Sequence, residues 1–83
     1  MSYQLRIEPS ALKSLNRIPE RDRQRIIASL AGIKKDPLEG KALEGELKGV
    51  RSLRVGEYRI LYRIFRQELL VIVIRIGSRQ GVY

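Results

Sequence analysis

The side chains that could do chemistry in this chain are arginines and tyrosines, because histidine and cysteine are both absent. Without histidine there is no Ser-His-Asp triad, and the usual general base near neutral pH is missing. A zinc site lacks its common ligands for the same reason. The nine acidic residues are scattered over predicted turns and helix starts, where structural roles account for them. We therefore predict neither a metal ion nor a cofactor.

Positive charge is concentrated in the second half of the sequence. Residues 48–83 carry eight lysines and arginines and only Glu57 and Glu68 as acids, within a net charge of +8. Such a concentration attracts phosphates. Fixed guanidiniums stabilise negative charge that develops on phosphoryl oxygens, although arginine keeps its proton and is a poor general base. These properties suit attack of an RNA 2′-hydroxyl on its neighbouring phosphate, because the substrate then supplies the nucleophile.

The candidate catalytic residues are Arg54, Arg59, Arg79 and Tyr83. Arg54 lies near the end of one predicted strand, and Arg59 begins the next strand across a tight turn. Arg79 follows the third strand, and Tyr83 is the last residue. The proton acceptor could be Tyr83, the C-terminal carboxylate or the RNA's own surroundings. The candidate RNA-binding residues are Arg51, Ser52, Arg63 and Ser78, although strand alternation points Arg51 to the opposite face from Arg54.

A structural interpretation of these arginines competes with the catalytic one. Exposed faces of antiparallel sheets usually alternate polar and apolar residues, so surface arginines at every second position are expected without any function. A generic basic surface also explains the net charge. The sequence pattern alone leaves both interpretations open.

The elements that must position these residues are three consecutive strands within residues 50–77. Gly56-Glu57 forms the first turn and residues 66–68 form the second. In the middle strand, alternation places one set of side chains on one face and a second set on the other. The two sets are Tyr58, Ile60, Tyr62 and Ile64, and Arg59, Leu61, Arg63 and Phe65. The third run, residues 69–74, is apolar without a break, which is typical of a central strand covered on both faces.

The first half of the sequence predicts one short strand and two helices. Residues 3–7 alternate as a strand, and a helix opens at Pro9 or Ser10. Pro19 separates this helix from a second one that stops at Asp36-Pro37. The predicted buried stripes are Ala11, Leu12, Leu15 and Ile18 in the first helix, and Ile26, Ile27, Leu30 and Ile33 in the second.

The second helix also carries arginines, which we interpret as a solvated face because Glu20 and Asp22 interleave them. Residues 38–49 form a glycine-punctuated connection, with Leu43 and Leu47 tucked beneath it. We expect an α+β fold in the order β-α-α-β-β-β. Its mainly antiparallel sheet should carry an αα-hairpin on one face.

Length and hydropathy predict one domain over residues 1–83. No run approaches the roughly 18 apolar residues of a membrane span. The first residues lack the basic and then apolar regions of a signal peptide. The expected location is therefore the cytoplasm.

Several stretches of the sequence resemble the RelE toxins of the RelE/ParE superfamily. They are residues 47–49, 53–62, 73–79 and 82–83. The resemblance implies a compact fold related to small microbial ribonucleases, cleavage of mRNA in the ribosomal A site, and neutralisation by a cognate antitoxin. By position, Arg54, Arg59 and Arg79 match family arginines that grip the mRNA backbone or stabilise the cleaved phosphate. Tyr83 matches a tyrosine that orients or activates the 2′-hydroxyl.

Two other functions are compatible with the same fold, because fold does not determine function. One is a ParE-like toxin that inhibits DNA gyrase without cutting RNA, which would not need the arginine and tyrosine cluster. The other is an inactive relative that only binds an antitoxin. For any of these, the charge favours an acidic, partly disordered antitoxin that folds on binding.

Overall fold

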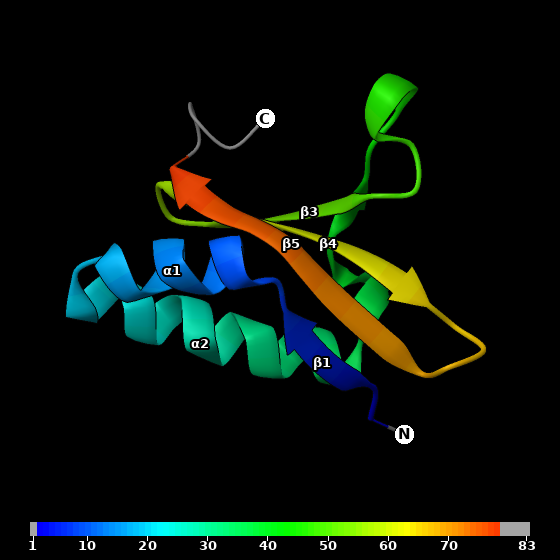
Figure 1. Cartoon of the computed structure of the whole chain (residues 1–83), viewed down its shortest axis with the longest axis horizontal. Helices are drawn as coiled ribbons and strands as arrows, with labels where there is room; N and C mark the ends of the chain where they lie inside the picture. The colour runs from blue at the N-terminus through cyan, green and yellow to red at the C-terminus, as the bar shows by residue number, and fades with distance from the viewer. Residues whose placement is uncertain (1, 79–83) are drawn as a thin grey trace.

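Two helices cover one face of a five-stranded sheet (Figure 1). The computed structural model describes residues 2–78. The elements are β1 (Gln4–Ile7), α1 (Pro9–Arg17), α2 (Glu20–Lys35), β2 (Lys41–Ala42), β3 (Arg51–Val55), β4 (Tyr58–Phe65) and β5 (Leu70–Ser78), with 3₁₀ turns η1 (Pro37–Glu39) and η2 (Gly45–Leu47). The predicted α+β class and the paired helices are confirmed. In the part of the chain that the structure describes, no helix is long and apolar enough to cross a membrane.

The strand order is β1-β5-β4-β3-β2, with β1 parallel to β5 and all other pairs antiparallel. The apolar third run is thus a central strand, as predicted, although it begins at Leu70 and continues past residue 74. Leu69 belongs to the preceding turn, where its φ of 50° is unusual for a residue with a side chain. The β3–β4 turn has Gly56 at φ 60°, which suits a type II′ hairpin.

The connection between α2 and β3 contains more structure than its glycines suggest. Residues 41–42 pair with residues 51–52 and add the edge strand β2, which was not predicted from the sequence. A strand of two residues is too short to show any periodicity. Leu43 and Leu47 pack over Val50 and Leu61 on the sheet face away from the helices, and the predicted tucking is confirmed.

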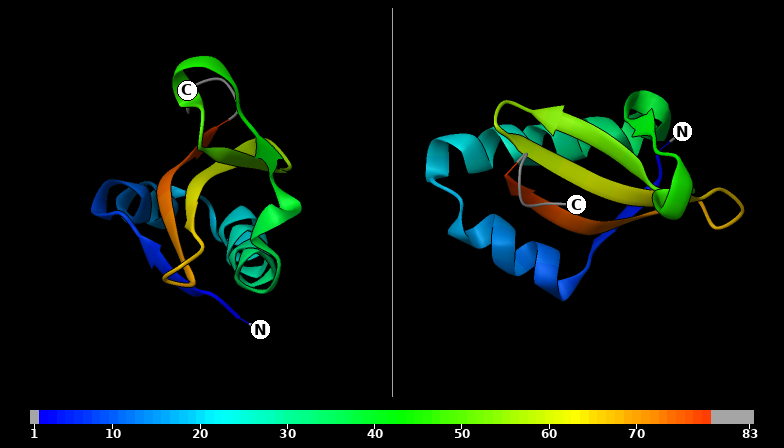
Figure 2. Two further views of the ribbon diagram at one scale, coloured as in Figure 1. Left: turned by 90° about the vertical axis from the view of Figure 1, so that its right-hand side faces the viewer. Right: turned by 90° about the horizontal axis from the view of Figure 1, so that it is seen from above.

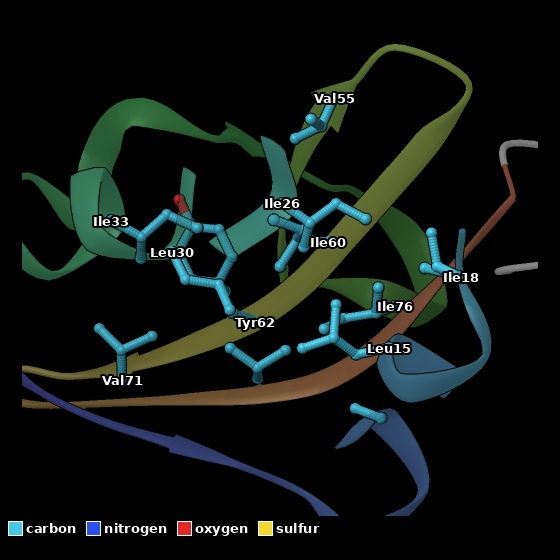
Figure 3. Packing of buried hydrophobic residues seen from close by; sticks show 12 residues of the cluster. Leu15, Ile18, Ile26, Leu30, Ile33, Val55, Ile60, Tyr62, Val71 and Ile76 are labelled. Atoms are coloured by element: carbon cyan, nitrogen blue, oxygen red, sulfur yellow. The ribbon is translucent and has the colours of Figure 1, made fainter. Parts of the chain in front are cut away.

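The main core lies between the helices and the sheet (Figures 2 and 3). The predicted helix stripes are buried there except at Leu12 and Ile27, which are each 43% exposed. Those two predictions were wrong because each of the residues follows a core residue directly. One step along a helix rotates a side chain by about 100°, away from the sheet. The alternation predicted for β4 is confirmed: Ile60 and Tyr62 are fully buried in this core.

Candidate functional site

The face of the sheet turned away from α1 and α2, here called the open face, is rich in arginine. Strands β1, β3, β4 and β5 contain six arginines and no aspartate or glutamate. Pairing and alternation place five of these arginines on the open face. They are Arg6, Arg54, Arg59, Arg63 and Arg75. With no histidine in the chain, this face offers permanent cations and no conventional general base.

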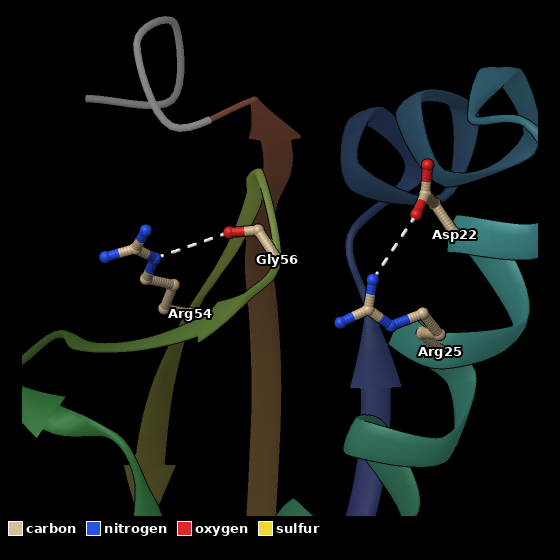
Figure 4. A network of polar contacts seen from close by, with 4 residues as sticks. All are labelled: Asp22, Arg25, Arg54 and Gly56. Carbon is tan, nitrogen blue, oxygen red and sulfur yellow. Dashed lines mark hydrogen bonds and ion pairs between the residues drawn. The ribbon is translucent and has the colours of Figure 1, made fainter.

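Arg54 and Arg59 lie directly opposite each other on β3 and β4, next to the hairpin turn. Arg54 is exposed, and its Nε donates a hydrogen bond to the Gly56 carbonyl at 3.3 Å (Figure 4). Arg59 is half-buried, and its Nη1 donates to the Ser52 hydroxyl at 3.3 Å. Like charges at directly opposite positions destabilise a sheet. The fold therefore tolerates a locally unfavourable pair of cations on strands that contain no acidic residue.

Ser52 itself is only 5% exposed. Its hydroxyl lies beneath the Arg59 guanidinium rather than on the surface. Ser52 was predicted as an RNA contact, but its burial suits it better to orienting Arg59.

A β-bulge brings a further cation to this surface. On β5, Ile74 is the extra residue, because Leu61 pairs with Arg75 whereas Tyr62 pairs with Val73. Without that insertion Arg75 would point toward the helices, since side chains alternate along a strand. With it, Arg75 is exposed on the open face, beside the Arg54–Arg59 pair. Bulges of this kind often re-aim side chains next to active sites. Arg75 is one of the eight basic residues of the second half, but the sequence pattern did not place it among the candidate site residues.

Arg51 occupies the opposite face and has a structural partner. Its Nη1 donates to the Gly40 carbonyl. The Gly40 amide in turn donates to the Tyr62 hydroxyl at 2.9 Å, and that hydroxyl donates to the Pro37 carbonyl at 2.7 Å. Burial raises the pKa of the Tyr62 phenol above its usual value of 10.0. This network anchors the connection before β3, so Arg51 is not placed with the open-face cations.

Arg63 is on the open face but away from the pair. It is four residues along β4 from Arg59, or about 13 Å at the usual rise of a strand. The apolar cluster of Val50, Leu61, Leu43, Leu47 and Ile74 lies between them. Arg63 therefore lies outside the cationic region at the β3–β4 turn, on the other side of Ile72 from Arg6.

The end of β5 adjoins this cationic region. Gly77 lies directly opposite Arg59, and Ser78 is exposed at the end of the strand. Arg79 and Tyr83, the other two candidate catalytic residues, lie outside the described residues.

Helix α2 contributes another cation at the turn. Arg25 forms an ion pair with Asp22 at 3.7 Å (Figure 4), and its Nη1 lies 3.1 Å from the position that a Cβ on Gly56 would occupy. From the sequence, Arg25 was expected to belong to a solvated helix face. No local pattern indicates its approach to a turn 31 residues further along. Among residues 2–78 no group of three or more acidic side chains is placed to hold a metal ion.

Comparison with known proteins identifies the family. A family model described as "ParE toxin of type II toxin-antitoxin system, parDE" matches residues 5–83. Toxin RelG of Mycobacterium tuberculosis is 34% identical over 85 residues, covering 100% of this chain and 98% of that protein. The crystal structure of the RelBE2 toxin–antitoxin complex of the same organism matches with a TM-score of 0.88 and 33% identity, covering 95% of this chain and 93% of the other.

The isolated Escherichia coli RelE toxin has the same fold. The TM-score is 0.82 with 22% identity, covering 93% of this chain and 84% of that one. Together with the match to RelG over the whole chain, these similarities show that the protein is a member of the RelE/ParE superfamily of type II toxin–antitoxin toxins.

Proposed function

We propose that the chain is a ribosome-dependent endoribonuclease that cuts mRNA in the ribosomal A site. The observation that carries the proposal is that Arg54 and Arg59 are paired directly across β3 and β4, on a face whose strands contain no acid. Two like charges on paired residues lower the stability of the sheet, and a bound phosphate would offset the repulsion between them. Such a pair is therefore expected on a surface that binds a polyanion.

The reaction needs no covalent protein residue. The 2′-oxygen of the RNA bonds to the adjacent phosphorus and the bond from phosphorus to the 5′-oxygen breaks. This leaves a 2′,3′-cyclic phosphate and a 5′-hydroxyl. The 2′-hydroxyl proton passes to an acceptor, and the departing 5′-oxygen gains a proton. Arg59, oriented by Ser52, and Arg54 stabilise the charge on the non-bridging oxygens. In this proposal Arg79 adds a third cation and Tyr83 orients the 2′-hydroxyl.

Dependence on the ribosome follows from the lack of a conventional base on the open face. A site of fixed cations accelerates the reaction only when the 2′-hydroxyl, phosphorus and leaving oxygen are aligned. Alignment supplied by a bound, ordered strand can lower a barrier by up to about 7–11 kcal/mol. Free RNA should consequently be cut poorly.

The direct test is cleavage in a purified translation reaction, read by primer extension. Arg59→Gln should slow cleavage by about 2–4 kcal/mol of barrier, or roughly 30- to 1,000-fold. Arg66→Gln is the matched control, since it removes the same charge from the β4–β5 turn, seven residues or about 23 Å along β4. Intact mRNA at every dose of the wild-type protein would refute the proposal.

We further propose an acidic antitoxin as the cellular partner. The net charge of +8 supports this, and similar toxins have been crystallised with antitoxins, as in the RelBE2 complex. Co-purification with the product of the adjacent reading frame is the test, and failure of the two proteins to associate would count against it.

Inhibition of DNA gyrase is the second candidate, because the matching family model is that of the ParE toxins. Gyrase inhibition has no need of the opposed arginines. If supercoiling by purified gyrase is blocked at doses that leave mRNA intact, this alternative replaces the nuclease.

A further inference from the structure

A groove separates α1 from the C-terminal half of β5. Its volume is about 370 Å³, and residues of both elements line it. Strand β1 pairs with β5 only as far as Val73, so residues 74–78 have β4 on one side and α1, rather than a strand, on the other (Figure 2). Backbone N–H and C=O groups along that edge of β5 therefore face the groove in place of a sheet partner.

The lining of this groove is rich in hydrogen-bonding groups. Ser10 and Ser14 contribute hydroxyls from α1, and Ser78 contributes one from β5. Each hydroxyl both donates and accepts hydrogen bonds. Gly77 has no side chain to cover the strand backbone, and Arg75 supplies a positive charge. None of the described lining residues is acidic, so the groove suits a ligand that carries polar edges and a negative charge.

The groove adjoins the cationic region of the open face. Gly77, one of its lining residues, lies directly opposite Arg59, which is one strand spacing or about 4.8 Å away. The bulge at Ile74 turns Arg75 onto the open face, and Arg75 also lines the groove. A strand of RNA whose phosphate meets Arg59 therefore has the groove within reach of its next nucleotide.

From these observations we propose that the groove between α1 and β5 holds the base of one nucleotide next to the scissile phosphate, with Arg75 binding the phosphate of that nucleotide. Single-stranded RNA is commonly recognised through splayed bases that hydrogen-bond along their edges, and this wall of serines and strand backbone offers such contacts. The inference rests on the proposed nuclease function and assigns that site a specificity-determining contact.

The first test uses a short RNA with 2′-O-methyl groups, which binds but cannot be cut because its nucleophile is blocked. Titrated into the full chain labelled with ¹⁵N, it should shift the amide signals of Ser14, Ile76 and Gly77 in a saturable way. Ser14→Leu fills the groove, and leucine is a good helix former, so helix α1 should be retained. This variant should bind the RNA about tenfold more weakly, or by about 1.4 kcal/mol. Ser29→Leu on α2 is the matched control and should bind as the wild type does.

Shifts confined to residues around Arg54 and Arg59, or unchanged binding by Ser14→Leu, would overturn the inference. Shifts of the groove signals by an acidic peptide and not by RNA would also overturn it, because the β5 edge would then be a peptide site. The amide spectrum of each variant without ligand shows whether it is folded.

The second test compares the positions of cleavage on translating ribosomes. Ser14→Leu should redistribute cutting among codons, whereas Ser29→Leu should leave the distribution unchanged. If the wild type cuts and Ser14→Leu cuts at the same positions with the same preference, the groove inference fails and the nuclease function stands. If the wild type does not cut at all, the proposed function fails, and the titration still decides whether the groove binds RNA.

Discussion

Removing the Tyr62 hydroxyl should destabilise the protein strongly. The side chain is fully buried, and its hydroxyl pairs with the Gly40 amide at 2.9 Å and the Pro37 carbonyl at 2.7 Å. In Tyr62→Phe both backbone groups lose that partner, and a buried polar group left unsatisfied costs about 1–3 kcal/mol. We expect a loss of about 2–4 kcal/mol, a large part of the roughly 4–12 kcal/mol expected for a domain of this size.

Urea unfolding followed by far-UV circular dichroism measures this loss, and the melting temperature should fall by roughly 10–20 °C. Tyr58→Phe is the matched control, since it removes the same atom from a half-buried tyrosine at the edge of the same core. Its effect should stay within about 0.5 kcal/mol. A loss below about 0.5 kcal/mol for Tyr62→Phe would refute the reasoning.

A double-mutant cycle tests the geometry of the same contact. A Cβ on Gly40 would lie 2.5 Å from the Tyr62 hydroxyl oxygen and 3.0 Å from the ring. Gly40→Ala should therefore be destabilising in the wild type and less so when the hydroxyl is absent. We expect the two substitutions to deviate from additivity by at least about 1 kcal/mol. Additive effects would mean that the two residues are not in contact.

Three further predictions concern charge, backbone and pH. Arg54→Gln should slow mRNA cleavage and yet raise the free energy of unfolding by roughly 0.2–1 kcal/mol, because it removes a like charge opposite Arg59; a loss of stability in urea would contradict this. Gly56→Ala should lower the free energy of unfolding by about 1–2 kcal/mol, because its φ of 60° is strained for alanine. Gly45→Ala is the control, since its φ is 69° and no atom lies within 4 Å of the added Cβ. The difference between the two variants therefore measures the contact with Arg25. The pKa of Tyr62 is higher in the folded state than the usual 10.0, so the neutral phenol favours folding, and this contribution to the free energy of unfolding is complete below pH 10.0. That contribution should decline as the pH rises through the higher folded-state pKa, and urea titrations at pH 9 and 11 should show a smaller decline for Tyr62→Phe.

Most of the fold could be predicted from local pattern. Strand alternation separated the side chains of the two faces of β4, Gly56 marked the hairpin turn, and Pro9 and Pro19 marked the helix starts. These signals are local because backbone preference and hydrophobic period act over a few residues. The same alternation separated Arg54 and Arg59 from the core.

The remaining features depend on which segments meet. The bulge that turns Arg75 outward arises from the pairing of β4 with β5, and one inserted residue leaves no trace in an apolar run. Arg51 is held by Gly40, and Arg25 approaches Gly56, through contacts between residues distant in sequence. The sequence by itself determined the two helices, the four longer strands and the cations that they carry. Only the tertiary structure decided which cations share a surface, because that depends on strand register and on packing between distant segments.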